Sequence, residues 1–217
     1  MKSGVQVKIC GITNRADAET ALTCGADALG FNFYPGSARC IGLTEARQWL
    51  PQLPAGVLKI AVLVNQPELG LELWQSGLVN ALQLHGDEDA AVCAALADAG
   101  AVFSKAIRVR DASSLAQPER WRTARLVFDA YQAGAYGGTG ERMDWELAAR
   151  FVASHPQCEV MLSGGLTPEN VSDAVRIVHP RAVDVASGVE VAGNPRRKDA
   201  EKMCRFVMSA KSALGDG

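Results

Sequence analysis

Short runs of apolar residues recur along the chain, each followed by polar turn residues and then by a segment with helical spacing. The runs are rich in Val, Ile, Leu and Phe and have the length of a strand. There are eight: Val5–Ile12, Ala28–Phe33, Lys59–Val64, Ala81–His85, Phe103–Val109, Arg125–Ala130, Glu159–Gly164 and Ala182–Gly188. Strands that alternate with helices indicate βαβ units and a parallel sheet. Divided among 217 residues, each unit has about 27, enough for a strand, a helix and two short loops.

Capping residues mark the first helical segments. Asn14 is expected to cap a helix that runs through Cys24, with Gly25 after its last turn. Thr44 stands before a second helix, which Pro51 ends.

Three later helices carry similar signals. Asp87 opens the Ala-rich stretch Glu88–Ala99. Thr167, followed by a proline and a glutamate, provides a cap and a first helical turn. Asp199 begins a last helix, which we expect to extend to about Leu214.

The simplest closure of eight βα units is a (β/α)8 TIM barrel, an α/β fold. The pattern shows no linker and no break in composition, so we expect one domain over residues 1–217. A doubly wound open sheet is the alternative, but its G-x-G-x-x-G fingerprint is absent after the first strand, where the chain reads Cys10-Gly11-Ile12-Thr13. In a barrel the active site lies at the carboxyl ends of the strands.

Composition narrows the class of protein. Hydrophobic residues make up 48% of the chain and charged residues 21%, as in an ordinary globular protein. The net charge of −2 provides no positive field for nucleic acid or an anionic membrane, so neither is an expected partner. The N-terminus lacks the apolar core of a signal peptide, and no apolar stretch reaches the roughly 20 residues of a membrane span. We therefore expect a cytoplasmic protein.

The cysteines are far apart along the chain, and the histidines are few. The six cysteines form no C-x-x-C motif, and free thiols are expected. The three histidines are scattered, so no metal site and no cofactor are predicted.

Glycine-rich loops follow the last two strands. Gly164 and Gly165 end the seventh run, and Ser187 and Gly188 end the eighth. Glycines let backbone N–H groups approach an oxyanion, and adjacent loops of this kind form the usual phosphate site of a barrel. Ordinary turns also need glycine. Two such loops at neighbouring strand ends favour phosphate, and hence a phosphorylated small-molecule substrate.

Cys10 and Asp129 end the first and sixth strands. A thiolate and a carboxylic acid that face one ligand make a base and an acid for moving a proton. Buried cysteine is often only a small apolar residue, but a carboxylate at the end of an apolar strand is costly unless it is used or paired. Lys8 lies two residues before Cys10 on the same strand face and could assist the thiol.

Two further residues are weaker candidates from position alone. Arg39, in the loop after the second strand, is either a surface charge or a grip on an anionic group. His85 ends the fourth strand and could be a structural histidine.

Together these segments resemble the phosphoribosylanthranilate isomerases of tryptophan biosynthesis, and the resemblance spans nearly the whole chain. The matching segments are Lys8-Ile9-Cys10-Gly11-Ile12-Thr13, Gly30-Phe31-Asn32-Phe33, the Pro35 to Arg39 loop, Gln83-Leu84-His85-Gly86-Asp87, Asp129, Gly137-Gly138-Thr139-Gly140, Asp144-Trp145, Ser163-Gly164-Gly165-Leu166-Thr167-Pro168-Glu169-Asn170-Val171, and Asp184-Val185-Ala186-Ser187-Gly188-Val189-Glu190.

The resemblance implies an Amadori rearrangement of N-(5-phosphoribosyl)anthranilate to 1-(2-carboxyphenylamino)-1-deoxyribulose 5-phosphate. It implies that Asp129 is the general acid that opens the ribose ring and that Cys10 is the general base that takes the C2′ proton. Arg39 would hold the anthranilate carboxylate, and His85 and Asp184 would orient the sugar. The phosphate ligands implied are Gly164, Gly165, Ser187 and Gly188. The protein would be a monomer or a homodimer.

Two departures from the family's pattern concern the arginine loop and the end of the chain. Where the family has Ser-Pro-Arg, this chain has Ala38 before Arg39, which leaves the loop freer before binding. A longer segment, Gly193–Asp199, adds Arg196 and Arg197, for which solvated loop charges are the favoured interpretation and a supporting role near the phosphate is the alternative.

Other functions remain open on sequence alone. One alternative is another phosphate-binding barrel enzyme. An activity similar to that of indole-glycerol-phosphate synthases would need a lysine acid and glutamates, and one similar to that of sugar-phosphate epimerases would need metal-ligating residues. This chain does not have them at the matching strand ends. A non-catalytic sensor of a phosphorylated ligand would use the same loops. A redox role for Cys10 is disfavoured, because no resolving cysteine lies nearby in the sequence.

Overall fold

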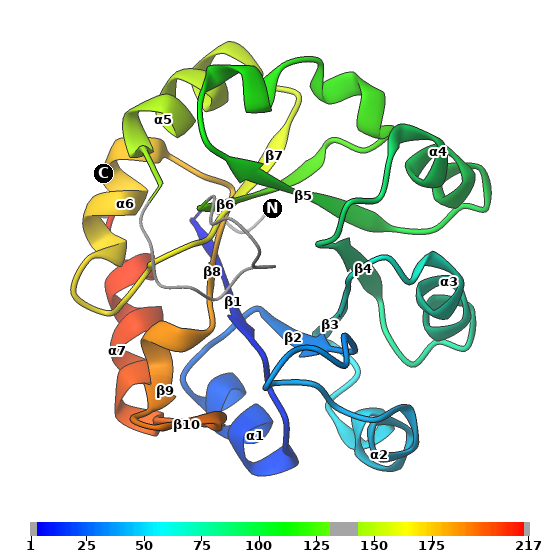
Figure 1. Ribbon diagram of the computed structural model, residues 1–217. Coiled ribbons are helices and arrows are strands. Elements are labelled where there is room, and N and C mark those ends of the chain that lie inside the picture. Colours follow the sequence, from blue (N-terminus) through cyan, green and yellow to red (C-terminus); the bar gives the residue numbers. More distant parts are fainter. Residues whose placement is uncertain (1–3, 131–142, 215–217) are drawn as a thin grey trace.

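Eight parallel strands close into a barrel, with the helices arranged around it (Figure 1). The computed structural model describes residues 4–130 and 143–214. The barrel strands are β1 (Gln6–Cys10), β2 (Ala28–Asn32), β3 (Leu58–Leu63), β4 (Ala81–Leu84), β5 (Phe103–Val109), β6 (Arg125–Ala130), β7 (Glu159–Leu162) and β8 (Ala182–Val185). Each strand pairs with the next and β1 pairs with β8, which confirms the predicted (β/α)8 TIM barrel.

The α-helices follow the strands in chain order. They are α1 (Arg15–Thr23), α2 (Leu43–Trp49), α3 (Pro67–Gln75), α4 (Ala90–Asp98), α5 (Trp145–Ser154), α6 (Val171–Val178) and α7 (Ala200–Lys211). Short 3-10 helices complete the connections: η1 (Leu50–Gln52), η2 (Ala112–Leu115), η3 (Pro118–Trp121) and η4 (Ser187–Val189). A small hairpin of β9 (Glu190–Val191) and β10 (Asn194–Lys198) precedes α7.

Side-chain alternation in β1 separates the core from the site. Val7 and Ile9 are fully buried in the apolar layer between barrel and helices. Lys8 and Cys10 have the opposite orientation, because successive side chains of a strand point to opposite faces. In the parallel pairing of β1 with β8, Lys8 is the partner of Asp184, so the strand register itself brings these two side chains together.

Aromatic contacts attach the helical ring to the barrel. Phe31 of β2 meets Trp49 of α2 edge to face, with ring centroids 5.6 Å apart. Phe128 of β6 meets Phe151 of α5 in the same way at 5.1 Å. Such pairs stabilise the fold beyond the burial of the rings. They hold the helices against the strands whose carboxyl ends carry the candidate site.

The connection after β5 differs from the regular pattern. It contains η2 and η3 in place of an α-helix. Gln117 and Arg122, on either side of η3, both have left-handed backbone conformations, with φ of 54°. A segment with left-handed residues at both ends cannot continue as an α-helix.

Of the predicted helix caps, two are confirmed and three are wrong. Thr44 lies inside α2, whose cap position is Gly42. Asn14 accepts a hydrogen bond from the N–H of Asp17, and Asp199 caps α7 in the same manner. The cap of α4 is Asp89, two residues later than predicted, because Asp87 instead pairs with Arg108.

The start of α6 is also displaced. Its first residue is Val171, and Asn170 occupies the cap position. Thr167 lies in the preceding turn, where its N–H donates to Asn170 Oδ1 at 2.8 Å. The sequence signal Thr-Pro-Glu therefore forms a turn before the helix.

The expectation of free thiols is wrong for Cys24 and Cys204, which form a disulfide across 180 residues of sequence. Closure of the barrel makes α1 and α7 neighbours, and the two Cα atoms lie 4.7 Å apart. Spacing along the chain could not reveal this proximity. Cys10, Cys40, Cys93 and Cys158 are free thiols. Among the residues that the structure describes, no helix is long and apolar enough to cross a membrane.

Candidate active site

A cavity of about 390 Å³ lies at the carboxyl end of the barrel. The predicted site residues that line it are Cys10, Arg39, His85, Asp129, Gly164, Gly165, Asp184 and Ser187. Gly188 does not line it: a Cβ there would overlap the Leu166 carbonyl, so Gly188 allows the loops after β7 and β8 to approach each other. Gly137-Gly138-Thr139-Gly140 lies outside the described residues.

A chain of hydrogen bonds crosses the floor of this cavity. Lys8 Nζ donates to Asp184 Oδ1 at 3.0 Å and to Gln83 Oε1 at 2.9 Å. The amide nitrogen of Gln83 lies 2.9 Å from His85 Nδ1. His85 Nε2 in turn lies 3.0 Å from Asp129 Oδ2. All five side chains are buried, so the chain is shielded from competing water.

The ammonium group of Lys8 determines which ring nitrogen of His85 carries the proton. An ammonium group only donates, so Gln83 must present its oxygen to Lys8 and its amide N–H to His85. His85 Nδ1 is therefore an acceptor, and the proton is on Nε2, which donates to Asp129. Burial lowers the pKa of Lys8, but the charges of Asp184 and Cys10 raise it by more, so the ammonium persists.

The two oxygens of Asp129 have different partners. Oδ2 accepts from His85. Oδ1 accepts the N–H of Ala130 at 3.0 Å and lies beside Gly164, where an added Cβ would be only 2.8 Å away. Each oxygen of the carboxyl group therefore accepts one N–H donor and keeps a second lone pair that can bind a proton.

Cys10 ends β1 next to Lys8, and Gly30 of β2 leaves the space for both side chains. A Cβ at Gly30 would be 2.8 Å from Cys10 Sγ. Burial is the main influence on the thiol and raises its pKa, and Asp184 adds to the effect. The cations Lys8 and Lys198 oppose it. The net effect is a raised pKa of the Cys10 thiol, which Lys8 opposes.

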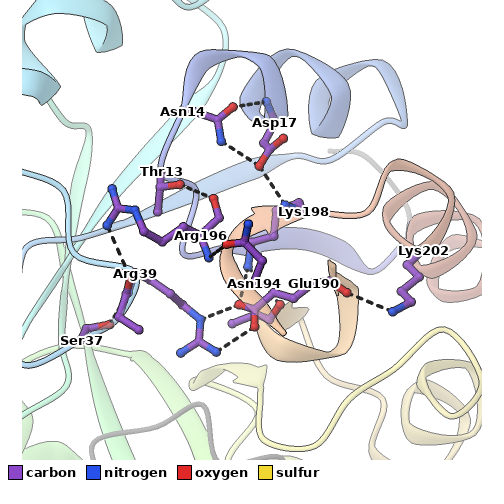
Figure 2. Close-up of polar contacts among 12 residues, drawn as sticks. Thr13, Asn14, Asp17, Ser37, Arg39, Glu190, Asn194, Arg196, Lys198 and Lys202 are labelled. Carbon is purple, nitrogen blue, oxygen red and sulfur yellow. Dashed lines mark hydrogen bonds and ion pairs between the residues drawn. The ribbon is translucent and has the colours of Figure 1, made fainter. Parts of the chain in front are cut away.

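Arg39 reaches the cavity from the loop after β2 and pairs with Glu190 (Figure 2). Its Nε donates to Glu190 Oε1 at 2.6 Å and its Nη2 donates to Oε2 at 3.1 Å. Burial lowers the pKa of Arg39, but the hydrogen bonds and charge of Glu190 raise it above its ordinary value. Arg39 is thus no loose surface charge.

The loop after β7 provides backbone donors. Gly164 and Gly165 have φ of 82° and 64°, a left-handed conformation that favours glycine. Their N–H groups donate to no other residue within the described ranges 4–130 and 143–214. Asn170 Nδ2 donates to the Gly165 carbonyl at 2.8 Å and holds the loop in shape. This arrangement suits an oxyanion.

Three residues important to this geometry were not among the predicted site residues: Gln83, Glu190 and Lys198. The two-residue alternation of Gln83 with His85 was a usable signal for the first, as that of Lys8 with Cys10 was for Lys8. Glu190 and Lys198 lie in the hairpin, whose pairing has no periodic signature. Asp184, predicted to orient a sugar, lines the cavity and pairs with Lys8.

No group of three or more His, Cys, Asp or Glu side chains with the arrangement of a metal site occurs in the described part of the chain.

Known proteins resemble this chain over nearly its whole length. The sequence profile of the family N-(5'phosphoribosyl)anthranilate (PRA) isomerase matches residues 7–209. The N-(5'-phosphoribosyl)anthranilate isomerase of Trichlorobacter lovleyi is 42% identical over 211 residues, 97% of this chain and 100% of the relative. That of Rubrobacter xylanophilus is 44% identical over 209 residues, covering 95% and 99%.

Solved structures agree. The phosphoribosyl anthranilate isomerase of Thermotoga maritima superposes with a TM-score of 0.84 at 36% identity, covering 95% of this chain and 98% of that one. A phosphoribosyl anthranilate isomerase in complex with reduced 1-(o-carboxyphenylamino)-1-deoxyribulose 5-phosphate has a TM-score of 0.81, 36% identity and the same coverage. The chain belongs to the N-(5'-phosphoribosyl)anthranilate isomerase family.

Proposed function

We propose that this chain converts N-(5-phosphoribosyl)anthranilate into 1-(2-carboxyphenylamino)-1-deoxyribulose 5-phosphate, a step of tryptophan biosynthesis, by paired acid and base catalysis. The observation that carries the proposal is that Cys10 and Asp129 line one cavity, where Lys8, beside Cys10, is joined to Asp129 by hydrogen bonds through Gln83 and His85. One proton donor and one proton acceptor in a shared cavity match the two proton transfers that this rearrangement needs.

The first step uses Asp129 as the acid. Its carboxylic O–H protonates the ring oxygen of the ribose, the C1′–O bond breaks, and the anthranilate nitrogen forms a double bond to C1′. The resulting carboxylate is stabilised by the His85 Nε2–H and the Ala130 N–H, which already point at its two oxygens. The acid is therefore held ready to become an anion.

The second step uses Cys10 as the base. Its thiolate removes the proton from C2′, and the electrons of that bond shift to form an enolamine with a neutral nitrogen. The enolamine then tautomerises to the ketone. Because burial raises the pKa of Cys10, the thiolate is a strong base once formed, and the positive imine of the substrate favours its formation.

The two anionic groups of the substrate, its anthranilate carboxylate and its phosphate, would bind to different loops of the site. Arg39 would hold the anthranilate carboxylate by a bidentate contact. The N–H groups of Gly164, Gly165 and Ser187 would hold the phosphate, with Gly188 shaping their loop. Asp184, fixed by Lys8, would orient the sugar hydroxyls.

The decisive experiment follows the loss of anthranilate fluorescence when the purified chain meets freshly made phosphoribosylanthranilate in the presence of EDTA. We expect rapid decay with the wild type and none with Asp129→Asn. The Asp129→Asn protein should still bind the reduced product analogue, because its cavity keeps its shape.

Cysteine variants provide a matched comparison. Cys10→Ser should lose at least about a thousandfold in kcat, because an alcohol is a far weaker base than a thiol. Cys93→Ser, at another buried free thiol away from the cavity, should retain activity. A folded wild type that binds the analogue without turnover would support a sensor and contradict the proposed reaction.

A Thermotoga maritima relative is described as a dimeric phosphoribosylanthranilate isomerase from which monomers were generated. For this chain, a monomer or a homodimer remains the expectation, and gel filtration with light scattering decides between them. A cytoplasmic location likewise remains a prediction.

A further inference from the structure

The β9–β10 hairpin lies beside the mouth of the barrel and contacts both the β1–α1 and β2–α2 loops (Figures 1 and 2). Its strands pair antiparallel, with Glu190 opposite Lys198. It contains Arg196 and Arg197, the two arginines that sequence reasoning assigned to solvent.

Glu190 is held on both sides. One side faces the Arg39 guanidinium, and the side chains of Arg39 and Glu190 are only 18% and 11% exposed. On the other side, Lys198 Nζ donates to Glu190 Oε1 at 3.1 Å and to the Ala186 carbonyl at 3.0 Å. Lys198 is itself buried. The carboxylate therefore has little freedom to move away from Arg39.

The contact leaves part of the Arg39 fork available. A planar guanidinium has five N–H donors, which form two edges that each fit one carboxylate. Glu190 occupies the edge formed by Nε and Nη2. Nη1 donates to no residue in the described ranges, and Arg39 lines the cavity. A second carboxylate can thus bind the remaining edge without displacing Glu190.

Arg196 fixes the backbone around Arg39. Its Nη1 donates to the Cys40 carbonyl at 2.7 Å and to the Ala38 carbonyl at 3.4 Å, the residues on either side of Arg39. Its own carbonyl accepts a hydrogen bond from Thr13 Oγ1 in the β1–α1 loop. The stem of Arg39 also packs against Gly11, where a Cβ would be 3.2 Å from Cγ of the arginine.

We propose that Glu190 and Arg196 are positioning residues, which hold Arg39 with one guanidinium edge turned to the carboxylate of the substrate. This inference rests on the proposed role of Arg39. Glu190 acts on the side chain and Arg196 on the loop backbone. Both reduce the conformational freedom that Arg39 would otherwise lose on binding. The hairpin is therefore part of the substrate-recognition apparatus.

A double-mutant cycle tests the Glu190 half. Glu190→Gln should raise KM about tenfold and change kcat less than about threefold, because a charge-assisted hydrogen bond to Arg39 is lost. Arg39→Ala alone should raise KM further, by about a hundredfold. In the Arg39→Ala background, Glu190→Gln should change KM by less than about twofold, since its effect passes through Arg39.

Neighbouring arginines test the Arg196 half. Arg196→Gln should raise KM about fivefold. Arg197→Gln, on the same strand, removes the ion pair of an exposed guanidinium with the buried Asp17 carboxylate of α1, which keeps its hydrogen bonds to Asn14 and to the Lys198 N–H, and should leave KM unchanged. If both arginine variants behave alike, the hairpin acts through general stability and the Arg196 role is wrong. Thermal unfolding of each variant checks that it is folded.

The outcomes separate the two proposals. An unchanged KM in Arg39→Ala would refute the carboxylate contact itself. A raised KM in Arg39→Ala with wild-type behaviour in Glu190→Gln would refute only the positioning role. A substrate that lacks the carboxylate, N-(5-phosphoribosyl)aniline, gives an independent readout, because its KM should not respond to Glu190→Gln.

Discussion

His85 donates its Nε2 proton to Asp129 Oδ2 at 3.0 Å, and Lys8, which is linked to His85 through Gln83, sets the direction of that hydrogen bond. The ammonium fixes the Gln83 amide, which fixes the histidine tautomer. The carboxyl group of Asp129 thus accepts an N–H at Oδ2, as it accepts the Ala130 N–H at Oδ1.

Replacement of His85 should affect kcat in a way that depends on the donor. His85→Leu removes the N–H that stabilises the Asp129 carboxylate, and we expect kcat to fall about 100-fold. His85→Gln keeps an amide N–H within reach of Asp129 and should retain most of the activity. Steady-state kinetics on both variants measure the difference. Equal losses in the two would show that the ring, and not its N–H, is what matters.

Gln83→Glu tests the tautomer. A carboxylate at position 83 still accepts from Lys8 but cannot donate, so it would draw a proton onto His85 Nδ1. The resulting imidazolium favours the ionised form of Asp129, which depletes the acid. We expect kcat at neutral pH to fall about tenfold and to recover partly at lower pH.

Gln83→Met is the control for Gln83→Glu, since it also removes the donor to His85 but adds no charge. Its pH profile should keep the wild-type shape at reduced amplitude. Identical profiles for the two variants would contradict the assigned proton positions.

Base catalysis by Cys10 predicts a definite pH dependence. The thiolate is the active form, and burial raises the pKa of the thiol. The fraction of thiolate in the free protein therefore grows with pH, and kcat/KM should still be rising above roughly pH 8.5, the ordinary value for cysteine. The difference in ultraviolet thiolate absorbance between wild type and Cys10→Ser measures the titration directly. A midpoint below the ordinary value would contradict the burial argument.

Gly164 should tolerate no side chain. A Cβ there would be 2.7 Å from the Ala130 nitrogen and 2.8 Å from Oδ1 of Asp129, the proposed acid. Gly164→Ala is expected to lower kcat at least about 100-fold. Gly77 has a similar positive φ of 72° but nothing within 4 Å of an added Cβ, so Gly77→Ala carries the same backbone strain without the clash. It should lose about 1 kcal/mol of stability and keep its activity.

Local sequence signals were sufficient for the barrel, because each βα unit has its own apolar run and turn residues. They also indicated that Cys10 and Asp129 face one ligand, and both line the cavity, whereas position alone left His85 open as a structural histidine. They could not reveal the direction of hydrogen bonds through Gln83, which depends on side-chain packing between β1 and β4.

Contacts between distant segments were equally hidden. The pairing of Glu190 with Arg39 spans 151 residues, and that of Arg196 with Cys40 spans 156. Both arise where the last βα unit closes on the first two. Arg196 looked like a solvated charge because its partners are backbone carbonyls, which have no sequence signature.

The disulfide between Cys24 and Cys204 should stabilise the fold without affecting catalysis. It joins α1 to α7 on the outer ring (Figure 1), while Cys10 and Asp129 lie at the barrel mouth. A cross-link over 180 residues restricts the unfolded chain, and we expect it to contribute about 2–4 kcal/mol to the free energy of unfolding.

In oxidising buffer, Cys204→Ser should therefore unfold roughly 5–15 °C below the wild type. With dithiothreitol the two proteins should unfold at the same temperature, because the wild type then loses the cross-link. Cys40→Ser, at a free thiol, is the control: its unfolding temperature should respond to dithiothreitol as that of the wild type does. A wild-type unfolding temperature that does not respond to dithiothreitol would mean that the cross-link contributes nothing, and the closure of α1 onto α7 would then depend on packing alone.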